Sequence, residues 1–250
     1  MIKVELGLGL LSIGREWGVE NVAPPAFDSA LALVHAALRS GITFYDTAPA
    51  YALSEAILSK ALSEDSTNRK QITVATKMGE YWDFESGRSY TSHCYSDLAA
   101  GIDRSLELLG QIDLLQLHKA DEKNIASKEV FRALDKAENE GIKTFGVSVK
   151  DVEAARLACE CGRYQYIQFP YSSGNTALKE IFTLVRNSNM KAIINRPFAM
   201  GGLVAKGTGF KPSDLFQFIL DENFSGIVLT GTSSQAHLSS NIEAFRSANS

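Results

Sequence analysis

Four side chains that can move protons stand close to the ends of apolar runs in the first half of the chain. Asp46 and Tyr51 lie in one short segment, whereas Lys77 and His118 each follow a separate apolar run. A tyrosine phenol has an ordinary pKa of about 10, and a neighbouring ammonium group lowers that value by favouring the phenolate. A carboxylate could hold the ammonium, and a neutral imidazole could donate a hydrogen bond to a carbonyl oxygen. Together the four groups could protonate an alkoxide as it forms.

Each of the four residues also has an ordinary structural interpretation. Asp46 could cap backbone amides in a turn that contains proline, with Tyr51 filling space. Lys77 could be a solvated lysine at a strand end, or the Schiff-base nucleophile of an aldolase-like lyase. His118 could cap the next turn. The hypothesis of a joint site therefore depends on whether the fold brings these side chains together.

The periodicity of the apolar residues predicts strands and helices that alternate about eight times. Phe27, Leu31, Val34 and Leu38, for example, have the spacing of one buried helical face. About eight strand–helix units in 250 residues fit one closed (β/α)8 TIM barrel, a single domain over residues 1–250, better than an open sheet. Strands are expected within 1–17, before Asp46, and at 72–76, 112–117, 144–148, 166–170, 191–195 and 226–229. Helices are expected at 54–62, 127–140, 151–161, 176–186 and 212–220, around Leu98–Leu109 and around Leu238–Phe245.

In such a barrel the carboxyl ends of all the strands open onto one face. Asp46 with Tyr51 would follow the second strand, Lys77 the third and His118 the fourth. Neighbouring strand ends would place these side chains within reach of one another. The predicted fold therefore favours the joint site.

The composition argues against several classes of protein. The formal net charge of −4 and pI of 5.6 disfavour nucleic-acid and membrane-surface binding, which need clustered Lys and Arg. No apolar run approaches the roughly 18 residues of a membrane span. Cys94, Cys159 and Cys161 form no disulfide framework, so we expect reduced thiols and a cytoplasmic location. Cys159 and Cys161 lack nearby histidines, so no metal site is predicted.

The motifs around these residues recur in a specific order along nearly the whole chain. They are Asp46-Thr-Ala-Pro-Ala-Tyr51, Ala75-Thr-Lys77, Leu117-His118, Gly146-Val-Ser148, Ile167-Gln168, Arg196-Pro197, and Gly231-Thr-Ser-Ser234 followed by Asn241. In this set the sequence resembles the aldo-keto reductase family. The resemblance implies a (β/α)8 barrel that reduces an aldehyde or ketone by hydride transfer from NADPH. It implies Tyr51 as general acid, Lys77 and Asp46 as the groups that tune its pKa, and His118 as the group that orients the carbonyl.

The resemblance also implies a set of cofactor-binding residues. Backbone amides at a helix N-terminus suit anions, although the segment 231–234 could equally be an ordinary loop and helix cap. The nicotinamide carboxamide is assigned to Ser148 and Gln168, and the pyrophosphate to the loop at Arg196 and Pro197. The adenosine phosphate is assigned to Gly231, Thr232, Ser233 and Ser234, with the basic position at His237, and the adenine to Asn241.

The sequence departs from the family pattern at the nicotinamide end. Val149 stands where many members have asparagine, and Asn195 stands where many stack an aromatic ring on the nicotinamide. No lysine stands at Gly231, so NADPH is expected but NADH stays open. These changes also suit an alternative function, a nucleotide-binding redox-sensing or regulatory barrel with little turnover.

At the substrate end, the segment between Leu203 and Lys211 is short, so the site is expected to be open. Trp17 and Trp82 are candidates for its aromatic walls, or else core residues. The expected partner is a small carbonyl substrate, and the expected state is a monomer or a weak homo-oligomer.

Overall fold

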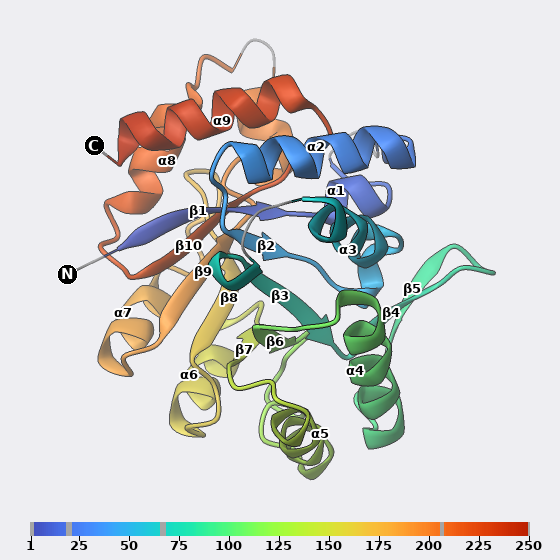
Figure 1. Ribbon diagram of the computed structural model, residues 1–250. Helices are drawn as coiled ribbons and strands as arrows, with labels where there is room; N and C mark the ends of the chain where they lie inside the picture. The colour runs from blue at the N-terminus through green and yellow to red at the C-terminus, as the bar shows by residue number, and fades with distance from the viewer. Residues whose placement is uncertain (1–2, 19–21, 66–68, 206–207, 250) are drawn as a thin grey trace.

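The chain folds around a closed barrel of eight parallel strands (Figure 1). The computed structural model describes residues 3–18, 22–65, 69–205 and 208–249. In chain order the strands are β1 (Val4–Gly9), β2 (Phe44–Asp46), β3 (Thr73–Met78), β6 (Leu114–Leu117), β7 (Phe145–Ser148), β8 (Tyr166–Pro170), β9 (Lys191–Asn195) and β10 (Gly226–Thr230). β1 pairs with both β2 and β10, which closes the sheet and confirms the predicted (β/α)8 class.

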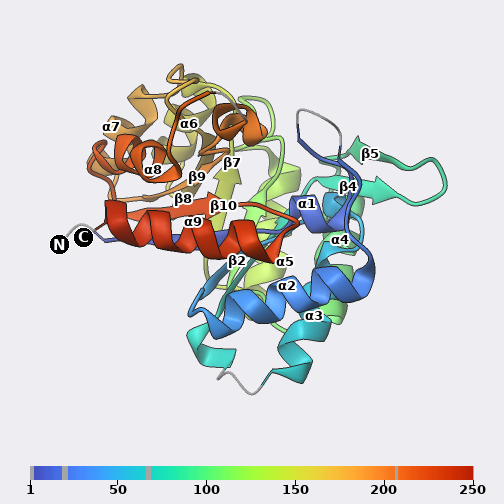
Figure 2. The same cartoon turned by 90° about the horizontal axis from the view of Figure 1, so that it is seen from above.

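Helices surround the barrel on its outside (Figure 2). They are α2 (Phe27–Arg39), α3 (Ser54–Glu64), α4 (Tyr95–Leu109), α5 (Lys128–Asn139), α6 (Val152–Glu160), α7 (Glu180–Asn187), α8 (Pro212–Leu220) and α9 (Gln235–Ala248). Side-chain caps begin three of them: Ser127 for α5, Asp151 for α6 and Ser234 for α9. Among the described residues no helix combines the length and apolar character that crossing a membrane requires.

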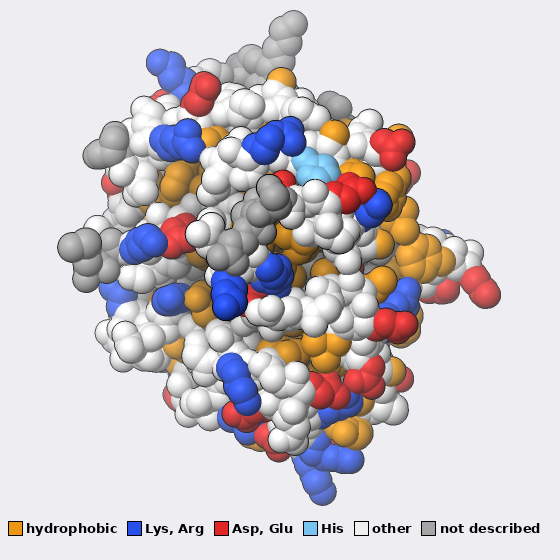
Figure 3. All heavy atoms as spheres, viewed as in Figure 1, with side chains coloured by type: hydrophobic (Ala, Val, Ile, Leu, Met, Phe, Trp, Pro, Cys, Tyr) orange, Lys and Arg blue, Asp and Glu red, His pale blue; other side chains and the backbone are white. Residues whose placement is uncertain are grey.

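The structure contains elements that the apolar periodicity did not predict. An antiparallel hairpin of β4 (Glu80–Asp83) and β5 (Arg88–Thr91) projects from the barrel between β3 and α4 (Figure 1). Its side chains Phe84 and Tyr90 are exposed, and in Figure 3 hydrophobic side chains gather toward its base, whereas acidic side chains stand at its tip. The remaining additions are short: α1 (Leu11–Gly14) and the 3-10 turns η1 (Pro49–Tyr51), η2 (Arg69–Gln71) and η3 (Ala199–Val204). The helix expected from residue 176 begins only at Glu180, because residues 177–179 form a turn.

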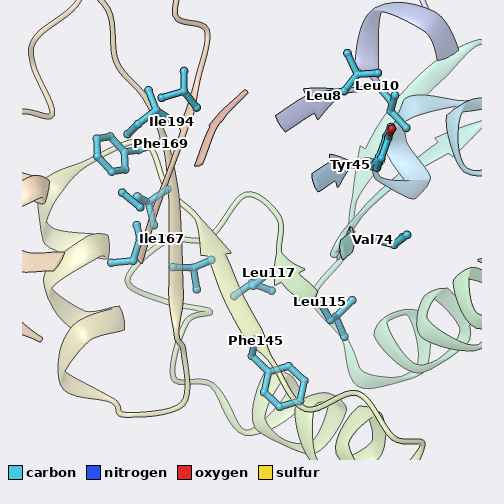
Figure 4. Close-up of a cluster of buried hydrophobic side chains, with 14 of the residues drawn as sticks. Leu8, Leu10, Tyr45, Val74, Leu115, Leu117, Phe145, Ile167, Phe169 and Ile194 are labelled. Atoms are coloured by element: carbon cyan, nitrogen blue, oxygen red, sulfur yellow. The ribbon is translucent and has the colours of Figure 1, made fainter. Parts of the chain in front are cut away.

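Of the hydrophobic clusters among the described residues, two hold the barrel together. The larger cluster joins strands to helices and includes Leu8, Tyr45, Val74 and Leu115 (Figure 4). The smaller cluster contains strand residues alone, which places it inside the barrel: Phe44, Ala75, Leu114, Ile193, Ile227 and Leu229.

The barrel interior is apolar in its middle layer and polar at the carboxyl ends of the strands. Successive strand residues point to opposite faces, so residues two apart share a face. Asp46 lies two positions after Phe44, and Lys77 lies two positions after Ala75. In the same way Gln116 follows Leu114 on β6 and Asn195 follows Ile193 on β9. The predicted catalytic end is thus the upper layer of the barrel interior.

Helix α1 packs directly against the turn that carries Tyr51. A Cβ atom added at Gly14 would lie 1.8 Å from the backbone oxygen of Tyr51, and 3.0 Å from Ser54 Cβ. This contact leaves no room for any side chain at Gly14, so glycine sets how closely the helix approaches the turn.

We predict that Gly14→Ala lowers the free energy of unfolding by about 1–3 kcal/mol, because the new methyl group must displace backbone rather than a flexible side chain. Urea unfolding would measure the change. Gly174→Ala is the control, since its Cβ would lie 3.3 Å from a terminal carbon of Leu203 that can move. Equal unfolding midpoints for the two variants would contradict the prediction.

Candidate active site

A buried ion pair joins the ends of β2 and β3. Lys77 Nζ lies 2.8 Å from Asp46 Oδ1 and 2.7 Å from Asp46 Oδ2, and it donates to the backbone oxygen of Thr47 at 2.9 Å. The two side chains are 0% and 4% exposed. Burial alone would lower the pKa of Lys77, but the charge of Asp46 raises it above its usual value. Lys77 is therefore an ammonium group with an acceptor for each of its three protons.

Two amides from neighbouring strands fix the carboxylate of this pair. Gln116 Nε2 donates to Asp46 Oδ1 at 2.9 Å, and Gln168 Nε2 donates to the same oxygen at 3.2 Å. Both glutamines are buried. Asp46 therefore accepts hydrogen bonds from an ammonium group on β3 and from amide groups on β6 and β8. These three strands together fix the orientation of its carboxylate.

Tyr51 stands beside both the ammonium group and the imidazole. Lys77 Nζ lies 4.8 Å from the centroid of the Tyr51 ring, and the rings of Tyr51 and His118 meet edge to face with centroids 5.9 Å apart. Burial raises the pKa of Tyr51, and the nearby charge of Lys77 opposes this rise without overcoming it. Lys77 thus lowers the pKa of Tyr51 as expected, but burial raises it by more, so the pKa lies above its usual value. The phenol keeps its proton at neutral pH and is available as an acid.

His118 follows β6 and is anchored through its backbone. Its N–H donates to the oxygen of Met78 at 2.8 Å, and its oxygen lies 2.9 Å from Nε2 of His93. The His93 Nε2 must carry a proton there, because a carbonyl oxygen only accepts. Burial lowers the pKa of His118 well below its usual value, and the charges of Lys77, Lys119 and Arg15 lower it further. The imidazole is neutral at pH 7, as the sequence-based hypothesis requires.

A single cavity of about 1000 Å³ runs from this cluster to the start of α9. Lys77 lies behind Asp46 and does not line it. Trp82 is also absent from the described lining residues. The Trp82 ring instead supports the guanidinium of Arg15, which does line the cavity, at 5.3 Å. The lining includes the remaining predicted residues: Asp46, Tyr51, His118, Trp17, Ser148, Gln168, Asn195, Arg196, Pro197, Gly231, Thr232, Ser233, Ser234, His237 and Asn241.

The cavity fits a large polar ligand such as a dinucleotide. Buried Ser12 Oγ and Asn195 Oδ1 have no hydrogen-bond partner among the described residues, and both residues line the cavity. Gln168 donates its amide nitrogen to Asp46, which leaves its oxygen for a carboxamide N–H. The Arg196 guanidinium lies 5.0 Å from the centroid of the Trp17 ring at the cavity wall.

The far end of the cavity is built by the N-terminus of α9. Ser234 N donates to Thr232 Oγ1 at 3.0 Å, and His237 N donates to Ser234 Oγ at 3.4 Å. Asn241 Nδ2 donates to Thr230 Oγ1 at 2.7 Å, so its oxygen is the group left for a ligand. Thus the helix-cap interpretation of segment 231–234 is correct, and it places the amides of a 14-residue helix at the cavity.

Sequence reasoning missed several residues at the catalytic end. Arg15, Glu80 and Lys119 line the cavity beside His118, and Gln116 holds Asp46. Gln116 carried a usable signal, because it is the one polar residue inside the apolar run 114–117. Glu80 belongs to the hairpin, and two short runs that flank a turn at Gly87 are a recognisable sequence pattern for such a hairpin.

We predict that Asp46→Asn lowers the free energy of unfolding by about 3–5 kcal/mol, because it leaves the buried Lys77 charge uncompensated. Urea unfolding would measure the loss. Arg156→Gln, which breaks the exposed pair of Arg156 with Glu180, serves as the control and should change the midpoint little. An Asp46→Asn midpoint equal to that of the wild type would contradict a central role for the buried pair.

A second prediction follows from the lowered pKa of His118. The unfolded chain binds a proton at this histidine below about pH 6.5, whereas the folded chain does not, so folding is destabilised as the pH falls through that value. We expect the wild type to lose more unfolding free energy than His118→Gln between about pH 7.5 and about pH 5.5. Urea titrations at the two pH values test this, and parallel losses would refute it.

Comparison with known proteins agrees with this geometry. A model of the Aldo/keto reductase family matches residues 5–216. L-galactose dehydrogenase of Arabidopsis thaliana is 29% identical over 223 residues, which cover 81% of this chain and 64% of that protein. Aldo-keto reductase YhdN of Bacillus subtilis is 27% identical over 210 residues, which cover 81% and 61%. The chain therefore spans less than two thirds of the length of these two relatives.

The barrel itself also has a counterpart among solved structures. The holo form of an aldo-keto reductase from Bacillus halodurans superposes with a TM-score of 0.80 at 22% identity, covering 96% of this chain and 86% of that chain. At that identity the likeness supports the fold alone. Because the family model covers most of the 250 residues and the barrel is closed, the chain belongs to the aldo/keto reductase family.

Proposed function

We propose that the protein catalyses the NADPH-dependent reduction of an aldehyde or ketone to an alcohol. The family consists of NAD(P)H-dependent oxidoreductases. One observation carries the proposal for this chain. The Tyr51 phenol lies against the Lys77 ammonium and the His118 ring, in the wall of a cavity that reaches the N-terminus of α9. These are an acid, a cation that can stabilise its conjugate base and a neutral ring, beside a cavity with room for a dinucleotide.

The residues of the chain supply the proton and the electrostatic environment. Tyr51 holds its proton at neutral pH and delivers it to the carbonyl oxygen as negative charge develops there. The phenolate that remains is stabilised by the Lys77 ammonium, and Asp46 keeps that ammonium charged and in place. His118 orients the carbonyl group from the side. A bound nicotinamide would supply the hydride.

We assign the cofactor residues in one line along the cavity. Ser148, Gln168 and Asn195 would hold the nicotinamide end, and Arg196 with Pro197 would follow the pyrophosphate. The adenosine end would rest on Gly231, Thr232, Ser233 and Ser234, with His237 and Asn241. The buried, unpartnered oxygen of Asn195 supports this direction, because it is an acceptor suited to an amide N–H.

The geometry bears differently on two other functions. A Schiff-base lyase needs a neutral, accessible amine, whereas Lys77 is buried, charged and bound to three acceptors. A regulatory nucleotide-binding barrel would use the same cavity without turnover.

We further propose a small carbonyl substrate, a cytoplasmic location and a monomeric or weakly oligomeric state. The three free cysteines suit a reducing compartment.

We predict that Tyr51→Phe reduces kcat by about 10²- to 10⁴-fold, since it removes the acid but keeps the ring beside Lys77. NADPH binding, followed through protein fluorescence, should stay near the wild-type value. Steady-state reduction of a panel of aldehydes measures the loss. Tyr90→Phe, on the exposed hairpin, is the matched control and should leave both quantities unchanged.

The same measurements separate the competing functions. Tight binding of nucleotide by the wild type with negligible turnover would favour the regulatory barrel. If the wild type neither binds nor oxidises NADPH or NADH with any aldehyde of the panel, the reductase assignment fails. A direct comparison of NADPH with NADH would also decide the preferred cofactor.

A further inference from the structure

An arginine without a partner stands in the wall of the cavity near the catalytic end. Arg15 directly follows α1, and its side chain lines the cavity. Its Nε is buried and has no hydrogen-bond partner among the described residues. Its charge is close enough to His118 to lower the pKa of that ring. The reaction described above gives this cation no role.

The ring of Trp82 holds the guanidinium of Arg15 in place. The guanidinium carbon lies 5.3 Å from the centroid of that ring. Trp82 belongs to β4, and its neighbour Tyr81 ties this hairpin to the barrel, because the Tyr81 hydroxyl donates to the oxygen of Asp97 at 2.9 Å. A tryptophan ring supports the guanidinium by a cation–π contact and takes none of its N–H groups.

The terminal nitrogens of Arg15 are left for a ligand. No hydrogen bond to the described residues uses them, and they are not among the buried, unpartnered atoms. They are therefore the part of the guanidinium that reaches the cavity. The planar fork of N–H groups on a guanidinium matches the two oxygens of a carboxylate.

The ion pairs around the catalytic end leave the charge of Arg15 uncompensated. Lys77 pairs with Asp46 at 2.7 Å, and Lys119 pairs with Glu80 at 3.3 Å. No carboxylate of the described residues forms an ion pair with Arg15, so one cation of this group is left over. A single free cation matches a carboxylate, which carries one negative charge, better than a phosphate dianion.

The contacts of Arg15 lie on the side of the cavity away from the proposed cofactor residues. Its partner Trp82 is on the β4–β5 hairpin, whereas the residues assigned to the cofactor lie on or follow β7 to β10. Two other cations of the described cavity wall, Lys150 and Arg196, follow β7 and β9. An anion held by Arg15 would therefore belong to the substrate.

We propose that Arg15 is a specificity-determining residue that binds a carboxylate of the substrate while Tyr51 donates its proton to the carbonyl oxygen. The substrate class is then the oxo acids, which are aldehydes or ketones that carry a carboxylate. The carbonyl part of this inference rests on the proposed function. The binding of a carboxylate by Arg15 does not depend on turnover.

This arrangement discriminates between substrates through the unmet hydrogen bonds of the guanidinium. A neutral carbonyl compound would displace water from Arg15 and offer it no charged acceptor in return. The loss of a charge-assisted hydrogen bond of this kind corresponds to roughly 10- to 100-fold in kcat/KM. The loss should appear mainly in KM, because a carboxylate remote from the reacting carbon binds equally in the ground state and the transition state.

The first test measures binding without turnover. Propanoate, butanoate and pentanoate are each titrated against the corresponding neutral amide, with and without NADP⁺, and ligand-observed NMR reports the affinities. We expect at least one carboxylate to bind the wild type about 10-fold more tightly than its amide. Arg15→Gln should lose this preference, and Arg15→Lys should keep part of it because the charge remains. The control Arg88→Gln removes a charge from an exposed position on β5 and should behave like the wild type.

Equal affinities for every acid and its amide in the wild type would overturn the proposal, whether or not the variants fold. NADPH affinity, followed through protein fluorescence, should be the same in Arg15→Gln and the wild type. If that affinity instead falls as far as the affinity for the carboxylate, the cation serves the phosphates of the cofactor and the proposal fails.

The second test compares kcat/KM for glyoxylate, 4-oxobutanoate and 5-oxopentanoate with the values for their methyl esters. We expect the wild type and Arg88→Gln to prefer at least one free acid over its ester by about 10-fold or more, and Arg15→Gln to lose that preference through KM. Esters that react as fast as all three acids would overturn the substrate class and leave the reductase function in place. Carboxylate binding that depends on Arg15, without turnover of any carbonyl compound, would do the reverse.

Discussion

The burial of one ion pair inside the barrel constrains the rest of the site. Removing a carboxylate and an ammonium group from water costs several kcal/mol for each ion, and their attraction offsets this only when the remaining hydrogen-bonding groups are satisfied. Asp46 and Lys77 meet that condition through Thr47, Gln116 and Gln168. The barrel must therefore provide polar side chains from several strands at one level, which the alternation along each strand allows.

The same burial separates the protonation states of the neighbouring groups. Tyr51 keeps its proton because burial raises its pKa, and His118 stays neutral because burial and nearby cations lower its pKa. Lys77 stays charged because its carboxylate partner outweighs the effect of burial. An acid, a fixed charge and a neutral ring thus coexist at one pH within a few ångströms, and environment rather than residue type assigns their roles.

Much of this arrangement can be predicted from the sequence, because the barrel follows from regular patterns. The alternation of strand and helix locates Asp46, Lys77 and His118 at neighbouring strand ends, and their proximity then follows from the topology. Patterns do not determine the balance of opposing energies, so the sequence predicts that Lys77 lowers the pKa of Tyr51 but not that burial raises it by more. They also do not place the side chains of an inserted hairpin, so the sequence does not predict Glu80 and leaves Trp82 open between the cavity wall and the core.

The β4–β5 hairpin gives the two ends of the cavity different mechanical support. Both strands of the hairpin pair only with each other among the described residues, and an isolated two-stranded sheet is marginally stable in water. The other end of the cavity is built by barrel strands and the long helix α9, and packed core elements of this kind open at a higher free energy than an isolated hairpin. We therefore expect mild heat or denaturant to free the hairpin before the barrel opens, and with it the part of the cavity wall that Glu80 forms.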